Sequence, residues 1–184
     1  MVIKATSSNA HQQVSALHAI GQLLGGTIQF EQALHDILKL LSDQLEMRLG
    51  TVSLLHSSEE QVSIDVAYGL SASQKERGRY KIGEGITGRV LESGKPVIVP
   101  RISNEPLFLD RTGARKRTKK SQTSFVCVPI LLKQQVVGTL SVDTPYEDDN
   151  RIQENVRLLS ITASMIGQSV AARQRSRAEK TTLI

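Results

Sequence analysis

Three glycines, Gly83, Gly85 and Gly88, form a G-x-G-x-x-G pattern between an expected strand and an expected short helix. In a dinucleotide-binding unit such glycines let the backbone approach a pyrophosphate at a helix N-terminus. That unit also requires a crossover helix and an acidic residue about 20 residues further on. Here residues 93–96 end the helix too early for a crossover, and Glu105 lies in a turn. The pattern therefore favours a sharp turn beside a cavity over a nucleotide site.

Three arginines, Arg89, Arg101 and Arg111, are the candidates for holding a small carboxylate ligand. A guanidinium binds a carboxylate through two parallel hydrogen bonds, and backbone N–H groups near Gly85 would add further donors. Each arginine could instead form a surface ion pair with a carboxylate close by in the sequence, at Glu84, Glu105 or Asp110.

Tyr68, Phe108, Phe125 and Cys127 are the candidates for the walls of such a cavity, and each aromatic could equally belong to the core. Cys127 is the one cysteine of the chain and lies in an apolar strand, so we expect a small buried hydrophobe and not a reactive thiol. No metal site is predicted, because the histidines are scattered, at His11, His18, His35 and His56.

The net charge of +5 over 184 residues comes from one segment, residues 111–120, which carries six basic side chains and no acidic one. The rest of the chain stands at −1. We expect a solvated surface loop, or a contact with phosphate, an acidic partner or nucleic acid.

An apolar stretch of about 20 residues and an apolar signal core are both absent, which favours a cytoplasmic protein without a membrane contact.

Hydrophobic periodicity predicts an α+β fold with an antiparallel sheet. The helices at the two ends of the chain should pack on one face of the sheet, while a short helix and a long loop cover the other face and leave a pocket. Helices are expected at residues 10–24, 30–47, 85–92 and 151–177, strands at 52–55, 61–68, near 80, at 97–99, 125–132 and 136–142, and the long loop at 101–123.

Three runs of sequence, YKIGEGITGRVLESGKPVIVPRI, SFVCVPI and VVGTLSVD, resemble a GAF domain, a small-molecule sensory module. The resemblance covers residues 12–172, with residues 1–11 as a flexible N-terminus and 173–184 as a linker to a missing ATPase domain. Residues 100–111, PRISNEPLFLDR, are similar to nitrogen-fixation activators of the NifA type, which are sigma-54-dependent transcriptional activators.

This resemblance implies a six-stranded antiparallel sheet, a homodimer through the terminal helices, and a regulatory, non-enzymatic role. It implies an effector, with 2-oxoglutarate favoured, an inhibitory anti-activator protein as partner, and nucleic-acid contact only through a missing C-terminal domain. The 184 residues contain no P-loop motif. Two alternatives stay open: a protein-interaction or dimerisation module without a ligand, and a cyclic-nucleotide-binding domain, although the N-K-F…D-E set of that branch is absent.

Related subclasses use chemistry that this sequence does not support. GAF proteins that reduce free methionine sulfoxide pass electrons through several cysteines, whereas Cys127 stands alone. Relatives that sense oxygen or redox state bind iron–sulfur clusters through cysteines near the N-terminus, and residues 1–30 contain no cysteine.

Overall fold

The computed structural model describes residues 2–55, 61–116, 122–146 and 149–182. The helices are α1 (Val2–Gly25), α2 (Phe30–Leu45), α3 (Ala72–Arg77), α4 (Gly85–Ser93) and α5 (Asp149–Thr182), with a short 3-10 helix η1 (Ile102–Asn104). The strands are β1 (Arg48–Leu54), β2 (Gln61–Ser63), β3 (Val66–Ala67), β4 (Arg79–Lys81), β5 (Val97–Val99), β6 (Thr123–Leu132) and β7 (Gln135–Pro145).

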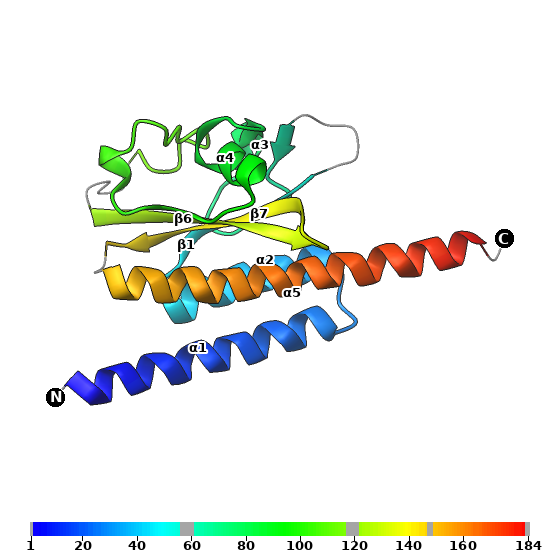
Figure 1. Cartoon of the computed structure of the whole chain (residues 1–184), viewed down its shortest axis with the longest axis horizontal. Helices are drawn as coiled ribbons and strands as arrows, with labels where there is room; N and C mark the ends of the chain where they lie inside the picture. Colours follow the sequence, from blue (N-terminus) through cyan, green and yellow to red (C-terminus); the bar gives the residue numbers. More distant parts are fainter. Residues whose placement is uncertain (1, 56–60, 117–121, 147–148, 183–184) are drawn as a thin grey trace.

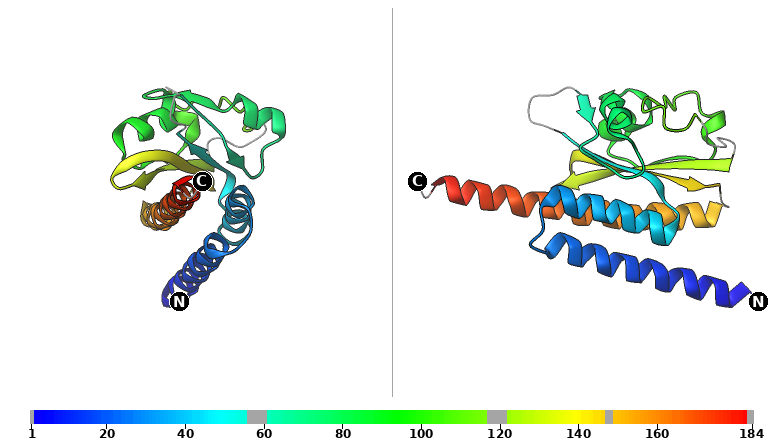
Figure 2. Two further views of the ribbon diagram at one scale, coloured as in Figure 1. Left: turned by 90° about the vertical axis from the view of Figure 1, so that its right-hand side faces the viewer. Right: turned by 180° about the vertical axis from the view of Figure 1, so that it is seen from behind.

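The central sheet is antiparallel throughout, in the strand order β3-β1-β7-β6-β5. Helices α2 and α5 pack against one face of it, and α1 lies outside them on the side away from the sheet (Figure 1). The end-on view in Figure 2 shows the same layers, with α3, α4 and the segment after β5 above the opposite face. The predicted α+β arrangement, with terminal helices on one face, is confirmed.

Alternation along the strands divides the core into two parts. On β6, Val126 and Val128 point toward the helices and join the larger cluster of buried side chains, whereas Phe125 and Cys127 point toward α4 and join the smaller one. Helix α2 presents a buried stripe at helical spacing, which consists of Ala33, Leu34, Ile37, Leu38 and Leu41. The period of two in the strands and of 3.6 in the helix therefore places a core on each side of the sheet.

The predicted strand at 61–68 is two separate strands, because Asp65 interrupts it. The Asp65 carboxylate accepts a hydrogen bond from the Leu54 N–H at 2.6 Å, and the Ile64 N–H donates to the Gly78 carbonyl at 3.1 Å. As a result β2 pairs with β4 in a two-stranded ribbon, while β3 pairs with β1. The expected six-stranded sheet is thus a five-stranded sheet with a ribbon beside it.

The terminal helices are longer than the sequence predicted. Helix α1 begins at Val2 and not near residue 10, so that most of the segment expected to be a flexible N-terminus is helical. Helix α5 runs from Asp149 to Thr182, beyond the predicted 151–177, and its C-terminal part projects past the sheet (Figure 1). None of the helices in the described residues combines the length and the apolar character that a membrane crossing requires.

Candidate functional site: a small cavity beneath residues 105–115

The cavity lies between the second face of the sheet and the segment that follows η1. Its floor includes the hydroxyl side chains of Thr51, Ser53 and Ser141, and its roof includes Phe108, Thr112 and Arg115. The Thr51 and Ser141 hydroxyls, on the neighbouring strands β1 and β7, are 2.7 Å apart. The cavity measures about 30 Å³, which is room for roughly one or two water molecules. The site is therefore a small cavity that polar and apolar side chains line together.

The glycine pattern forms the turn from β4 into α4. Gly83 has a φ of 82°, and its N–H donates to the Gly88 carbonyl at 2.8 Å. A Cβ at Gly88 would lie 2.1 Å from the Lys81 carbonyl oxygen, and one at Gly85 would lie 2.9 Å from the Leu109 side chain. The glycines thus allow close backbone packing, and the segment above covers the start of α4. These contacts agree with the predicted sharp turn and leave no open cradle for a pyrophosphate.

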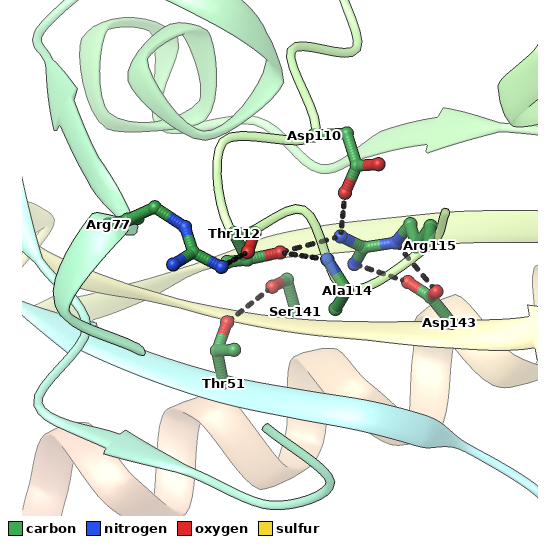
Figure 3. A network of polar contacts seen from close by, with 8 residues as sticks. All are labelled: Thr51, Arg77, Asp110, Thr112, Ala114, Arg115, Ser141 and Asp143. Carbon is green, nitrogen blue, oxygen red and sulfur yellow. Dashed lines mark hydrogen bonds and ion pairs between the residues drawn. The ribbon is translucent and has the colours of Figure 1, made fainter. Parts of the chain in front are cut away.

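Arg115 reaches down from the roof and forms the most highly connected polar group of the site (Figure 3). Its Nε and Nη2 donate to the two carboxylate oxygens of Asp143 on β7, each at 2.7 Å. Its Nη1 donates to Asp110 at 3.3 Å. The guanidinium carbon lies 4.9 Å from the ring centre of Phe108 and 5.6 Å from that of Phe125. The guanidinium is thus held by two carboxylates and two aromatic rings.

Thr112 connects this cluster to the neighbouring elements. Its hydroxyl accepts hydrogen bonds from the Ala114 N–H at 3.3 Å and from Arg115 Nη1 at 3.4 Å. Arg77, at the end of α3, donates to the Thr112 carbonyl at 2.7 Å (Figure 3). The segment is therefore tied to α3 as well as to β7.

Burial governs the titration of the groups around the cavity. Burial raises the pKa of the Asp143 carboxyl, and Arg115 partly offsets that effect. Burial alone would lower the pKa of Arg115, but Asp143 and Asp110 outweigh it, so that the pKa of the guanidinium is raised. Burial also raises the pKa of the Tyr80 phenol, which lines the cavity. Arg115 is therefore a permanent cation, and Tyr80 is a neutral hydroxyl.

A family model described as the GAF domain matches residues 29–170. The chain belongs to the GAF domain family. This GAF domain is 36% identical over 154 residues to the nitrogen fixation protein AnfA of Azotobacter vinelandii, a match that covers 84% of this chain and 29% of that relative. It is 34% identical over 165 residues to the Nif-specific regulatory protein of Azospirillum lipoferum, a match that covers 89% of this chain and 26% of that relative. The predicted resemblance to nitrogen-fixation regulators is confirmed.

Among solved structures, the GAF domain resembles the crystal structure of the A. aeolicus nlh2 GAF domain in an inactive state. The TM-score is 0.82 at 21% identity, over 89% of this chain and 98% of that one. This likeness supports the fold. The chain spans less than a third of the two curated relatives above.

Of the predicted site residues, the GAF domain brings Phe108 and Phe125 together at the cavity. Their rings meet edge to face, with centres 5.0 Å apart. Arg111 lies at the rim, where it pairs with Glu84 and its guanidinium carbon is 5.9 Å from the Tyr80 ring centre. The surface ion pair considered for Arg111 is thus present.

The other four predicted residues lie elsewhere. Tyr68 packs with the helix-side core, its ring edge to face with His35 at 5.6 Å. Arg89 is exposed on α4, and Arg101 is exposed with its guanidinium carbon 4.2 Å from the Tyr146 ring centre. Cys127 is fully buried behind the cavity wall.

Cys127 is a packing residue in this structure. Burial raises the pKa of its thiol to about 12, against the lowering effect of hydrogen bonds with Thr139 and Thr87. The thiol is therefore neutral at physiological pH, as the predicted buried hydrophobe requires. In the described part of the chain, no three or more histidine, cysteine, aspartate or glutamate side chains gather closely enough to hold a metal ion.

Arg115 and Asp143 belong to this site but are not among the site residues that the sequence predicts. The sequence places Arg115 in the basic segment 111–120, for which a solvated loop was expected, but its side chain is buried, with 5% of the residue exposed. Arg111 and Lys116 are exposed, and residues 117–120 lie outside the described residues. The available signal was Asp143, a carboxylate that directly follows a predicted apolar strand and therefore requires a cationic partner if it is buried.

Proposed function

We propose that this GAF domain is the effector-sensing regulatory domain of a sigma-54-dependent transcriptional activator of nitrogen fixation genes. The names of two relatives, a nitrogen fixation protein and a Nif-specific regulatory protein, support this assignment. The chain matches 29% and 26% of those relatives, so its role would be to control activity that resides in other domains.

The observation that carries the proposal is a buried guanidinium beside a polar cavity. An anionic effector needs fixed positive charge or aligned donors, and Arg115 supplies a planar fork in a site largely screened from water. The hydroxyls of Thr51 and Ser141 could meet the other end of a small dicarboxylate. We favour 2-oxoglutarate as that effector. Since the cavity holds only about 30 Å³, binding of this effector requires the segment at 105–115 to move away from the sheet.

A route from the cavity to the C-terminal helix runs through β6 and β7. Asp143 on β7 carries the ion pair with Arg115, and β7 pairs with β6 along most of its length. Helix α5 packs on the other face of β6 so closely that a Cβ at Gly167 would lie 2.3 Å from the Leu131 carbonyl oxygen. A shift of the strands would therefore displace α5. An effector acts in this way if it binds the open and closed forms with different affinity, typically by about 1–3 kcal/mol.

Calorimetry of the 184-residue chain with 2-oxoglutarate tests the effector. We expect saturable heat and a rise in melting temperature, because a ligand that binds the native state stabilises it. Glutarate, which keeps the five-carbon chain and both carboxylates but lacks the keto group, is the matched ligand control. The absence of both heat and a thermal shift at millimolar 2-oxoglutarate would rule this effector out.

We also propose that the domain is not an enzyme. Its relatives carry regulatory names, and its cysteine is fully buried with a pKa raised to about 12. A thiol in that state is not a nucleophile at physiological pH. Turnover of free methionine sulfoxide by the chain, lost in Cys127→Ala, would contradict this part of the proposal.

A dimerisation role is the second candidate, and one surface favours it. Val14 on α1 is 67% exposed and Ile161 on α5 is 48% exposed, on either side of a groove between the two helices. Glu154 and Arg157 border the same groove and offer opposite charges to a second copy. Light scattering of Val14→Lys and Ile161→Lys, compared with Val14→Leu, tests this surface. Dimers in all three variants would exclude it as the interface.

A further inference from the structure

The guanidinium of Arg115 is bound by three groups of its own chain. Asp143 occupies the fork formed by Nε and Nη2, while Nη1 donates to Asp110 and to the Thr112 hydroxyl. An incoming carboxylate that takes the Nε and Nη2 fork has to displace Asp143. Asp143 therefore stands in a bidentate position that an anionic effector would use.

The cluster has more negative than positive charge. One guanidinium faces the carboxylate of Asp143, with 3% of the residue exposed, and that of Asp110, whose side chain is 13% exposed. A carboxylate this far from water is costly unless it is paired. Asp143 therefore gains more from Arg115 than an exposed acid would, and it competes strongly with any other anion for the same donors.

The two competitors are of unequal strength. Asp143 makes two hydrogen bonds of 2.7 Å in fork geometry from a central strand. Asp110 makes one at 3.3 Å and lies on the same segment as Arg115, so it moves with the arginine when the segment moves. Release of the fork thus depends chiefly on Asp143.

We infer that Arg115 is the anchor for the carboxylate of the effector and that Asp143 is an internal competitor that sets the effector's affinity. When the segment opens, the ligand carboxylate replaces Asp143 on the guanidinium, and Asp143 becomes solvated. The inference rests on the proposed function, since it names the residues that decide affinity and selectivity at that same cavity. It predicts that weakening the competitor strengthens the binding of a carboxylate ligand.

The test is calorimetry with 2-oxoglutarate on Asp143→Asn, Asp110→Asn and the parent chain. Asparagine keeps the shape and an acceptor oxygen but removes the charge. We expect affinity to rise by roughly tenfold or more in Asp143→Asn, the scale of one charge-assisted interaction, and by less in Asp110→Asn. Arg89→Gln, at an exposed arginine outside the cavity, is the matched control and should leave affinity unchanged.

Arg115→Gln leaves Asp143 buried without its partner and is at risk of misfolding. The double variant Arg115→Gln/Asp143→Asn avoids the unpaired charge and should lose binding while it keeps its circular dichroism spectrum. Equal or weaker binding by folded Asp143→Asn, in a parent chain that binds, would overturn the inference and leave the proposed function intact. An absence of binding in the parent chain and in Asp143→Asn alike would overturn both.

Discussion

Arg115 and Asp143, on a surface segment and on a central strand, join both carboxylate oxygens to two guanidinium nitrogens at 2.7 Å. This contact joins the segment to the sheet, next to a cavity of about 30 Å³. Because Phe108 and Phe125 flank the guanidinium, the pair also has a fixed orientation. A ligand that takes the place of Asp143 on this guanidinium would have to separate the two side chains.

The energetic role of this pair can be measured with a double-mutant cycle. Arg115→Met leaves a buried carboxylate unpaired, and we expect it to lower the free energy of unfolding by about 3–5 kcal/mol. The double variant Arg115→Met/Asp143→Leu removes both charges and should recover most of that loss, since a buried pair and an apolar replacement are often close in stability. Urea denaturation measures the free energy of unfolding of the parent chain, the two single variants and the double variant. Additive losses would show that the two side chains do not depend on each other.

The buried thiol predicts a specific alkaline destabilisation. Its pKa is raised in the folded state, from 9.0 to about 12, so its contribution is complete below pH 9 and is lost as pH rises toward 12. In that window the unfolded state releases a proton that the folded state retains, and the free energy of unfolding falls by about 1.4 kcal/mol per pH unit. Denaturation of the parent chain and of Cys127→Ala between pH 8 and pH 11 isolates this contribution. Parallel pH profiles would mean that the thiol titrates normally.

The turn into α4 should tolerate no side chain at its third glycine. A Cβ at Gly88 would lie 2.1 Å from the Lys81 carbonyl oxygen, and we expect Gly88→Ala to cost about 3 kcal/mol. Gly25→Ala is the matched control, because nothing lies within 4 Å of the added Cβ there. Thermal denaturation of the two variants gives the comparison, and a Gly88→Ala variant as stable as Gly25→Ala would contradict the packing described for this turn.

The break between β2 and β3 should depend on the Asp65 side chain. Asp65→Ala removes the acceptor of the Leu54 N–H, and we expect a loss of about 1–3 kcal/mol, the cost of an unsatisfied backbone donor. Asp65→Asn keeps an acceptor oxygen and should retain most of the stability. Chemical denaturation of both variants checks this order. Equal stability in Asp65→Ala and the parent chain would indicate that the strands divide for another reason.

Features that depend on local sequence could be predicted, and those that depend on distant partners could not. The apolar stripe of α2 and the apolar run of β6 are patterns within one element, and both appear in the structure as the expected helix and strand. Tyr68 is a residue whose position depends on a distant contact. An unbroken strand would put it on the same face as Ile64, which lines the cavity, but the hydrogen bond from Leu54 to Asp65 divides the strand and Tyr68 packs among the helices.

Dependence on distant partners also explains why the sequence does not predict Arg115 as a site residue. Nothing next to Arg115 in the sequence distinguishes it from the basic residues around it. Its inward position depends on Asp143, 28 residues away, and on the aromatic side chains beside it. The sequence predicts Phe108 and Phe125 as cavity walls or as core residues, and both line the cavity. A buried cation is recognisable only once its carboxylate partner is known.

A crystal structure of the chain saturated with 2-oxoglutarate tests the central claim most directly. The account predicts a ligand carboxylate within about 3 Å of the Arg115 guanidinium, with the Asp143 carboxylate no longer bonded to it and residues 105–115 moved off the sheet. A ligand bound elsewhere, with both Arg115–Asp143 hydrogen bonds still at 2.7 Å, would contradict it.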